Sequence, residues 1–392
     1  MSKITDIIWS YLRGDKVVWT IVFSLFIVSM LAVYSATGTL AYAKEVSSTY
    51  YLFKQITLAL FGLALMYVFH LIDYRYYSRI SQILWVISIP LLIYTMFGTQ
   101  STNDANRWIR LPFVGLTFQT SDLAKLALIM LLARQLSLRQ ENIGDFRQSF
   151  VPTLIPVVVT CMLIAPENLS TALILFCTAV LVMFIGRIPI RHIALLTGAG
   201  LLAAGIFLAV LFLVPESWLT GRMPTWKNRI ENYINQISGA PADLEEDYQV
   251  TQAKIAIAKG GLLKLNPGGS DQRNFLPQAY NDFIYVIIIE EYGVLGGAVL
   301  LFLYLFLLYR CIRIAIDAPK VFGALLAVGL GFALVIQAMV NMAVAVNLFP
   351  VTGVTLPLVS MGGSSVIFTS IAFGIILSVS RSVQDEAQTE PA

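Results

Sequence analysis

Residues Ile193–Val214 read IALLTGAGLLAAGIFLAVLFLV, a run of 22 residues without a charged side chain. An α-helix crosses the hydrocarbon core of a bilayer with about 20 apolar residues, because each residue adds about 1.5 Å. The whole chain has 392 residues, of which 57% are hydrophobic and 12% are charged, whereas soluble domains carry roughly 25% charged residues. A water-soluble fold could not bury so much apolar surface. The sequence therefore predicts an all-α, polytopic membrane protein.

Runs of the same character recur along the whole chain and predict about ten spans in a single membrane domain, residues 1–392. The expected spans are Val17–Ala36, Gln55–Ile72, Ile80–Phe97, Leu123–Leu136, Phe150–Ala165, Thr171–Ile185, Ile193–Val214, Phe283–Tyr309, Phe322–Val346 and Ser364–Ser380.

The basic residues predict the orientation of these spans. Connections on one side carry 14 Lys and Arg residues, whereas the short connections on the other side carry only Lys44, Lys54, Arg107 and Arg110. Basic residues accumulate in short cytoplasmic loops, and the number of spans is even, so we expect both termini in the cytoplasm. The net charge of +3 gives no reason to expect a nucleic-acid partner.

Two connections and the C-terminal tail differ from short turns. Residues 215–281 are expected to form one large extracytoplasmic loop before the eighth span, with an amphipathic stretch at Trp226–Ile237. The segment Asn347–Ser365 carries no charge and contains two prolines and a Met-Gly-Gly-Ser-Ser run. Such backbone between two spans is typical of a re-entrant or cavity-lining loop. The tail, residues 384–392, is expected to be a disordered cytoplasmic segment.

Asp282 lies where the large loop meets the eighth span, directly before Phe283 and Ile284. An apolar setting at the membrane interface favours the protonated form of a carboxylate, which makes Asp282 a candidate proton acceptor. Asp is also a preferred helix N-cap, so these residues alone leave both interpretations open.

Glu290 follows Asp282 by eight residues, about 12 Å along a helix. Paired catalytic carboxylates in glycosidases stand roughly 5–10 Å apart, so the two residues form a poor acid–base couple. We expect Glu290 to bond a neighbouring helix or to shape a polar cavity. Gln337 and Asn341, four residues apart in the ninth span, are expected to form hydrogen bonds between helices.

Asp122 and Lys125 open the fourth span, and their spacing of three places them on one face of a helix. Lys125 is suited to bind an anionic headgroup or a diphosphate, although pairing with Asp122 or extension to the membrane surface is an equally good interpretation. Arg107 is either a second phosphate ligand or a solvated loop residue. The Ser360–Ser365 run offers small residues whose backbone N–H groups suit an anion.

Several segments, taken together and in chain order, resemble the SEDS family (shape, elongation, division and sporulation proteins). They are NRWI at Asn106–Ile109, FQTSDLAK at Phe118–Lys125, FLP at Phe275–Pro277, NDFI at Asn281–Ile284, EEYG at Glu290–Gly293, PVTG at Pro350–Gly353 and LPLVSMGGSS at Leu356–Ser365.

This resemblance implies a peptidoglycan glycosyltransferase that polymerises lipid II into β-1,4 glycan strands at the outer face of the bacterial cytoplasmic (inner) membrane. It also implies partners, namely a class B penicillin-binding protein, which is a transpeptidase, and other division proteins. A divalent cation, Mg or Mn, is expected from the family, although the sequence shows no metal site and implies no organic cofactor. Asp282 falls on the catalytic aspartate of the family. The residues expected to bind substrate are Arg107, Gln119, Asp122, Lys125, Ser360, Gly362, Gly363, Ser364 and Ser365.

The chain departs from the family pattern just before the aspartate, where Tyr280-Asn281 replaces the usual His-Thr. The compact segment Gly260–Pro277 resembles that of the division member, FtsW, more than that of the elongation member, RodA, which predicts septal synthesis. The alternatives are an elongation-type polymerase and a lipid II transporter, which would need polar groups across the membrane midplane.

Overall fold

The computed structural model describes residues 12–98, 108–110, 117–219, 221–238 and 244–389. The elements are α2 (Lys16–Ala36), α3 (Gly38–Ala43), α4 (Ser48–Leu71), α5 (Tyr74–Gly98), β1 (Trp108–Arg110), β2 (Thr117–Gln119), α6 (Thr120–Leu138), η1 (Gln140–Asn142), η2 (Phe146–Phe150), α7 (Val151–Ile164), α8 (Leu169–Ile185), α9 (Ile190–Leu213), η3 (Glu216–Trp218), α10 (Met223–Ser238), α11 (Leu244–Gly260), η4 (Gln272–Asn274), α12 (Ile284–Asp317), α13 (Val321–Ala345) and α14 (Gly363–Thr389).

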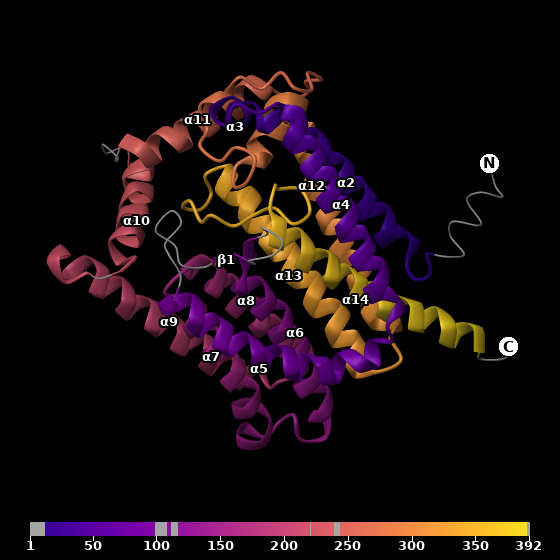
Figure 1. Cartoon of the computed structure of the whole chain (residues 1–392). Helices are drawn as coiled ribbons and strands as arrows, with labels where there is room; N and C mark the ends of the chain where they lie inside the picture. Colours follow the sequence, from indigo (N-terminus) through magenta and orange to yellow (C-terminus); the bar gives the residue numbers. More distant parts are fainter. Residues whose placement is uncertain (1–11, 99–107, 111–116, 220, 239–243, 390–392) are drawn as a thin grey trace.

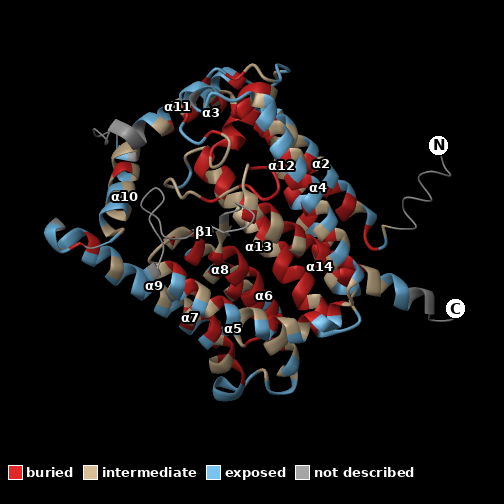
Figure 2. Cartoon of the chain, viewed as in Figure 1, coloured by how far each residue is buried: buried red, intermediate tan, exposed pale blue. Residues whose placement is uncertain are grey.

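The helices form a membrane bundle, as the sequence predicts. In the described part of the chain, eight helices are long and apolar enough to cross a bilayer: α2, α4, α5, α7 with η2, α9, α12, α13 and α14. The shorter α8 and the more polar α6 bring the number to ten. In the most apolar stretches of α13 and α14, 67% of residues are buried, against 11% in α9, so α13 and α14 form the centre and α9 lies at the edge (Figure 2).

The start of α2 and the end of α14 lie at one end of the bundle, which we call the termini end; the opposite end is the loop end (Figure 1). Gly14 and Gln384 exchange two hydrogen bonds there, at 3.1 and 3.0 Å, and Arg75 pairs with Glu386 at 3.3 Å. The structure describes α14 as a helix to Thr389, whereas the sequence analysis expected a disordered tail from residue 384. The short antiparallel pair of β1 and β2, which precedes α6, was not predicted from the sequence.

α12 is broken at Gly293, whose φ of 75° and ψ of 177° lie in a region that is essentially restricted to glycine. We call the segment before the break, Ile284–Tyr292, the half-helix. A Cβ placed on Gly297 would lie 3.0 Å from the Tyr285 hydroxyl, although 12 residues of straight helix span about 18 Å. The half-helix therefore folds back alongside the helix that follows it.

Two serines on α2 show in which direction the half-helix runs. Ser35, at the loop end of α2, donates a hydrogen bond to the Glu291 carboxylate. Ser29 donates to the carbonyl oxygen of Val359 at 2.9 Å. Six helical residues span about 9 Å, so Glu291 lies about 9 Å nearer to the loop end than Val359.

Asp282, which lies two residues before the half-helix, is near the level of Val359. The neighbouring hydroxyl of Ser360 donates to the carbonyl oxygen of Asn281 at 2.6 Å. The sequence analysis placed Asp282 at the outer end of a straight span with Glu290 deeper, and the structure reverses this order. The reason is the break in α12, which turns the first nine residues back toward the loop end.

Candidate functional site

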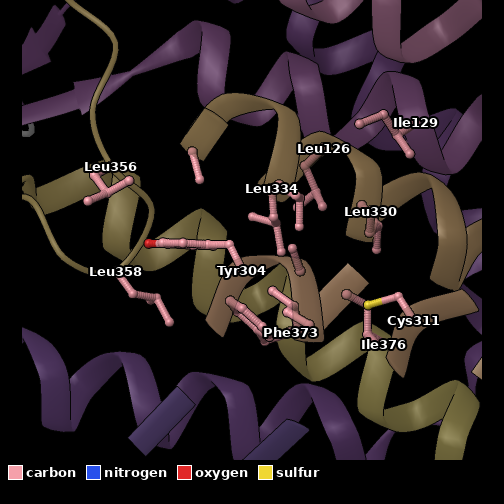
Figure 3. Packing of buried hydrophobic residues seen from close by; sticks show 14 of the residues in the cluster. Leu126, Ile129, Tyr304, Cys311, Leu330, Leu334, Leu356, Leu358, Phe373 and Ile376 are labelled. Carbon is pink, nitrogen blue, oxygen red and sulfur yellow. The ribbon is translucent and has the colours of Figure 1, made fainter. Parts of the chain in front are cut away.

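A cavity opens between α6, α8, α13 and α14. Its polar side chains are Asp122, Lys125, Gln337 and Ser365, with the hydroxyls of Thr178 and Thr369. The rest of its wall is apolar and continues into the buried core, where Leu126, Ile129, Leu330 and Leu334 lie together (Figure 3). The cavity thus combines one cationic end with an apolar wall, which suits an amphiphile with an anionic group.

Lys125 lies at the polar end of this cavity and makes two contacts. Its Nζ is 2.9 Å from Asp122 Oδ1 and donates to Gln337 Oε1 at 3.1 Å. The Asp122 carboxylate also accepts from the Ser364 hydroxyl at 3.3 Å. The ion pair with Asp122 is confirmed. Lys125 also lines the cavity, and its binding of an anionic group stays a prediction.

Gln337 and Asn341, one turn apart on α13, hold the loop between α13 and α14. Gln337 Nε2 donates to the carbonyl oxygen of Thr355 at 2.9 Å. Asn341 Nδ2 donates to the carbonyl oxygens of Val354, at 2.7 Å, and Asp282, at 3.0 Å. One face of α13 thereby connects the surroundings of Lys125 with those of Asp282. The expected bond between helices is confirmed for Gln337, which accepts from Lys125 of α6, whereas Asn341 donates to loop carbonyls instead.

The Asp282 side chain lies against the tightest turn of that loop. Gly353 has a φ of +66°, and a Cβ at this position would lie 3.6 Å from Asp282 Oδ2. Burial raises the pKa of Tyr280, and the neighbouring Tyr51 and Asp282 raise it further. Asp282 is half-buried, so it is neither sealed in the core nor turned out to bulk solvent.

The remaining predicted substrate-binding residues divide into two groups. Ser365 lines the cavity and Ser364 bonds Asp122 at its edge. Gln119 bonds the Ser121 hydroxyl instead, and the buried Ser360 hydroxyl is engaged with backbone groups of the loop. Gly362 and Gly363 are not among the described residues that line the cavity. Arg107 lies outside the described residues.

Glu290 was expected to bond a neighbouring helix or to shape a polar cavity. It does not line the cavity described above, and it bonds the segment that contains the short helix η4 instead of a membrane-spanning helix. Its carboxylate accepts from the Ser270 hydroxyl and from backbone N–H groups of Asp271 and Gln272, all in the segment before the half-helix. The contacts of Glu291 with Ser270 and Ser35, of Gly353 with Asp282 and of Thr355 with Gln337 were not predicted from the sequence. The Thr-Gly pair inside an uncharged loop was the available signal for Gly353, because such a loop needs a residue that tolerates positive φ.

A divalent cation would need carboxylate or imidazole ligands from the chain unless the substrate supplies them. The described residues contain no group of three or more His, Cys, Asp or Glu side chains that could hold a metal ion. Asp122, the acidic residue of the cavity, is engaged by Lys125. The described residues therefore do not form a protein-built cation site, and no chemical step is assigned to a metal here.

Comparison with known proteins identifies the family of this chain. The family model for FtsW, RodA and SpoVE, described as "Cell cycle protein", matches residues 15–385. Stage V sporulation protein E of Bacillus subtilis is 33% identical over 372 residues, covering 94% of this chain and 97% of that protein. A probable peptidoglycan glycosyltransferase FtsW of Geobacter sulfurreducens is also 33% identical over 372 residues, covering 94% of this chain and 95% of that protein.

Solved structures share the fold over nearly the whole chain. A chain from a structure on the coordination of polymerization and crosslinking by a peptidoglycan synthase complex has a TM-score of 0.73 at 25% identity, covering 94% of this chain and 98% of that chain. The rod shape determining protein RodA of Thermus thermophilus has a TM-score of 0.66 at 24% identity, covering 94% and 97%. With the family model spanning almost every described helix, the chain belongs to the FtsW/RodA/SpoVE family of cell cycle proteins.

Proposed function

We propose that this protein is a peptidoglycan glycosyltransferase that polymerises lipid II at the outer face of the bacterial cytoplasmic membrane. One observation carries the proposal: Asn341 and Gln337 tie Asp282 and Lys125 to adjacent residues, Val354 and Thr355, of one loop. A carboxylate and a cation are thus held on either side of a short segment beside an apolar cavity. This is the pairing that transfer of a sugar from a lipid diphosphate requires.

In the proposed reaction, Asp282 removes the proton from the 4-hydroxyl group of the acceptor sugar as the oxygen attacks the anomeric carbon of the donor. The bond from that carbon to the diphosphate oxygen breaks, and its electron pair leaves with undecaprenyl diphosphate. One displacement inverts the anomeric centre and converts an α-linked diphosphate into a β-1,4 bond. The negative charge on the leaving group is stabilised by Lys125, with Arg107 as a second candidate.

The polar end of the cavity would bind the diphosphate, with Lys125, Asp122, Ser364 and Ser365 around it. The apolar wall would receive the first isoprenyl units of the lipid. Both termini are proposed to lie in the cytoplasm, because the basic termini end of the bundle would then face inward. Residues 215–281 would form an extracytoplasmic segment that includes α10 and α11.

The proposed partner is a class B penicillin-binding protein that cross-links the new strand, together with other division proteins. Support comes from the structural neighbour, which belongs to a peptidoglycan synthase complex that polymerizes and crosslinks. The curated relatives described above carry the names FtsW and stage V sporulation protein E, which favours septal synthesis over elongation. A divalent cation, if one is used, would be held mainly by the substrate diphosphate.

The test uses purified full-length protein, fluorescent lipid II and detection of glycan polymer in detergent. Asp282→Asn should lower the polymerisation rate by about 10²- to 10⁴-fold, the usual contribution of a general base. Asp145→Asn, which alters an exposed helix cap far from the site, is the control and should keep the parental rate. Polymer formation by Asp282→Asn at the parental rate would reject the proposal, and a protein that moves lipid II without polymerising it would be a transporter.

A further inference from the structure

Glu290 and Glu291 form a buried acidic pair at the loop end of the half-helix, and each is only 1% exposed. Both bind the segment Asn266–Asn274, which we call the docking loop. Glu290 accepts from the Ser270 hydroxyl, and from the backbone N–H groups of Asp271 at 3.2 Å and Gln272 at 3.3 Å. Glu291 accepts from Ser270 N at 3.3 Å and from the Ser35 hydroxyl of α2.

The docking loop is itself fixed to the rest of the bundle. Arg273 Nη1 donates to the carbonyl oxygens of Gly268, at 2.9 Å, and Ser35, at 3.2 Å. The Thr39 hydroxyl donates to the carbonyl oxygen of Arg273 at 3.0 Å. The backbone N–H of Asn266 donates to the carbonyl oxygen of Glu291 at 3.0 Å. The pair of glutamates therefore joins the half-helix to a rigid frame that includes α2.

The end of α11 packs directly against the same point. Gly260 lies so close to the half-helix that an added Cβ would clash with the carbonyl group of Ile289 and would lie 3.2 Å from the Cα of Glu290. Gly293 is equally tight, because an added Cβ would lie 2.7 Å from the Leu262 carbonyl oxygen. Backbone atoms of other segments thus surround the end of the half-helix that carries Glu290 and Glu291, and they restrict its movement.

The break at Gly293 makes this attachment important for Asp282. In a continuous helix, the rest of the helix would fix the orientation of the first residues. Because of the break at Gly293, the orientation of the half-helix depends on its contacts with other segments. It is about 13 Å long, so a tilt of about 5° at the glutamates moves the Asp282 end by about 1 Å. An error of that size in a catalytic group lowers rates by as much as about 100-fold.

We propose that Glu290 and Glu291 are positioning residues that set the place of Asp282 through the half-helix. The proposal rests on the proposed function in one respect, that Asp282 is the general base. Neither glutamate contacts the cavity or Asp282, so both act at a distance through backbone geometry. A purely structural anchor would change stability when lost, without changing the rate constant of the folded enzyme.

The kinetic test compares Glu290→Gln and Glu291→Gln with the parent, because both replacements keep the side-chain shape. We expect kcat for lipid II polymerisation to fall about 10- to 100-fold, with KM within about twofold, in protein that still melts cooperatively. Glu290→Asp should restore part of kcat. Glu231→Gln, which alters a glutamate on α10 paired with Lys227, is the control. If Glu290→Gln does not fold, Ser270→Ala replaces it and should show the same loss.

A second measurement reports position without activity. Cysteines are placed at the exposed Gln278 and Thr49 after replacement of Cys161, Cys177 and Cys311, and the distance between two spin labels is measured. The parent should give one narrow distance distribution, and Glu290→Gln with Glu291→Gln should shift or broaden it. Asp282→Asn should keep the parental distribution.

The two measurements distinguish the positioning role of the glutamates from the proposed function of Asp282. Parental kcat in the folded glutamate variants, or an unchanged distance distribution in the double variant, overturns the positioning role. Parental activity of Asp282→Asn rejects the proposed function instead, and the distance measurement would still decide whether the glutamates position the half-helix.

Discussion

The Asn341 side chain donates a 3.0 Å hydrogen bond to the backbone carbonyl oxygen of Asp282. Asn341 belongs to α13, the most buried long helix of the bundle together with α14, whereas Asp282 precedes a half-helix that is separated from its own span by a glycine break. The candidate catalytic residue is therefore positioned by a helix that follows it by about 60 residues of sequence. Contacts of this kind lead to specific expectations for variants.

Asn341→Ala should disturb the site through backbone groups. It leaves the buried carbonyl oxygen of Val354 and the part-buried one of Asp282 without this donor, which costs about 1–3 kcal/mol in the free energy of unfolding. We also expect polymerisation to fall at least about tenfold, because the half-helix start and the loop lose a shared anchor. Asn228→Ala, at an exposed position of α10, should change neither quantity; equal activity of both variants would refute the expectation.

Gly353→Ala tests the turn that lies against Asp282. An L side chain at a φ of +66° costs about 1–2 kcal/mol, and the new methyl group would contact Asp282 Oδ2. Gly221→Ala is a matched control, because Gly221 has a φ of +63° with no neighbouring atom within 4 Å of an added Cβ. Both variants should lose similar stability in unfolding titrations, but only Gly353→Ala should lose activity. A similar activity in both would mean that the methyl group does not reach the reacting carboxylate.

Lys125→Met should weaken substrate binding and leaving-group stabilisation together. A charged hydrogen bond is worth about 1.5–3 kcal/mol, so kcat/KM for lipid II should fall about 10- to 100-fold. The change also leaves the buried Asp122 without its ion pair, and the stability should fall. Adding Asp122→Asn should restore the melting temperature but not kcat/KM. The exposed Lys44→Met provides the control, and recovery of activity in the double variant would assign Lys125 a structural role only.

Asp15→Ala should reduce stability and leave the chemistry intact. Asp15 is buried, caps α2 by accepting from Val17 N and Val18 N, and pairs with Arg310 at the termini end. Loss of both contacts should cost about 2–4 kcal/mol, measured by unfolding in detergent mixtures. Asp145→Ala removes a cap with the same two-bond pattern but no ion pair with described residues, and should cost about 1 kcal/mol. Equal costs would show that the Arg310 pair contributes nothing.

Much of the site could be predicted from sequence where neighbours in the chain decide the geometry. Asp122 and Lys125 meet because three residues separate them on one helix, and they do meet, at 2.9 Å. Gln337 and Asn341 share a face for the same reason. Their partners, the carbonyl oxygens of Thr355, Val354 and Asp282, could not be predicted, because they depend on how a loop without regular structure packs against α13.

The sequence alone is enough to predict a bundle of membrane-crossing helices, because the length of each hydrophobic run is a local property of the chain. The order of the acidic residues between the loop end and the termini end depends on the tertiary structure. Glu290 and Glu291 face the loop end and Asp282 lies deeper, since a single glycine dihedral at position 293 turns the half-helix back. A backbone reversal of this kind leaves no hydrophobic period in the sequence, and only the contacts of the folded chain reveal it.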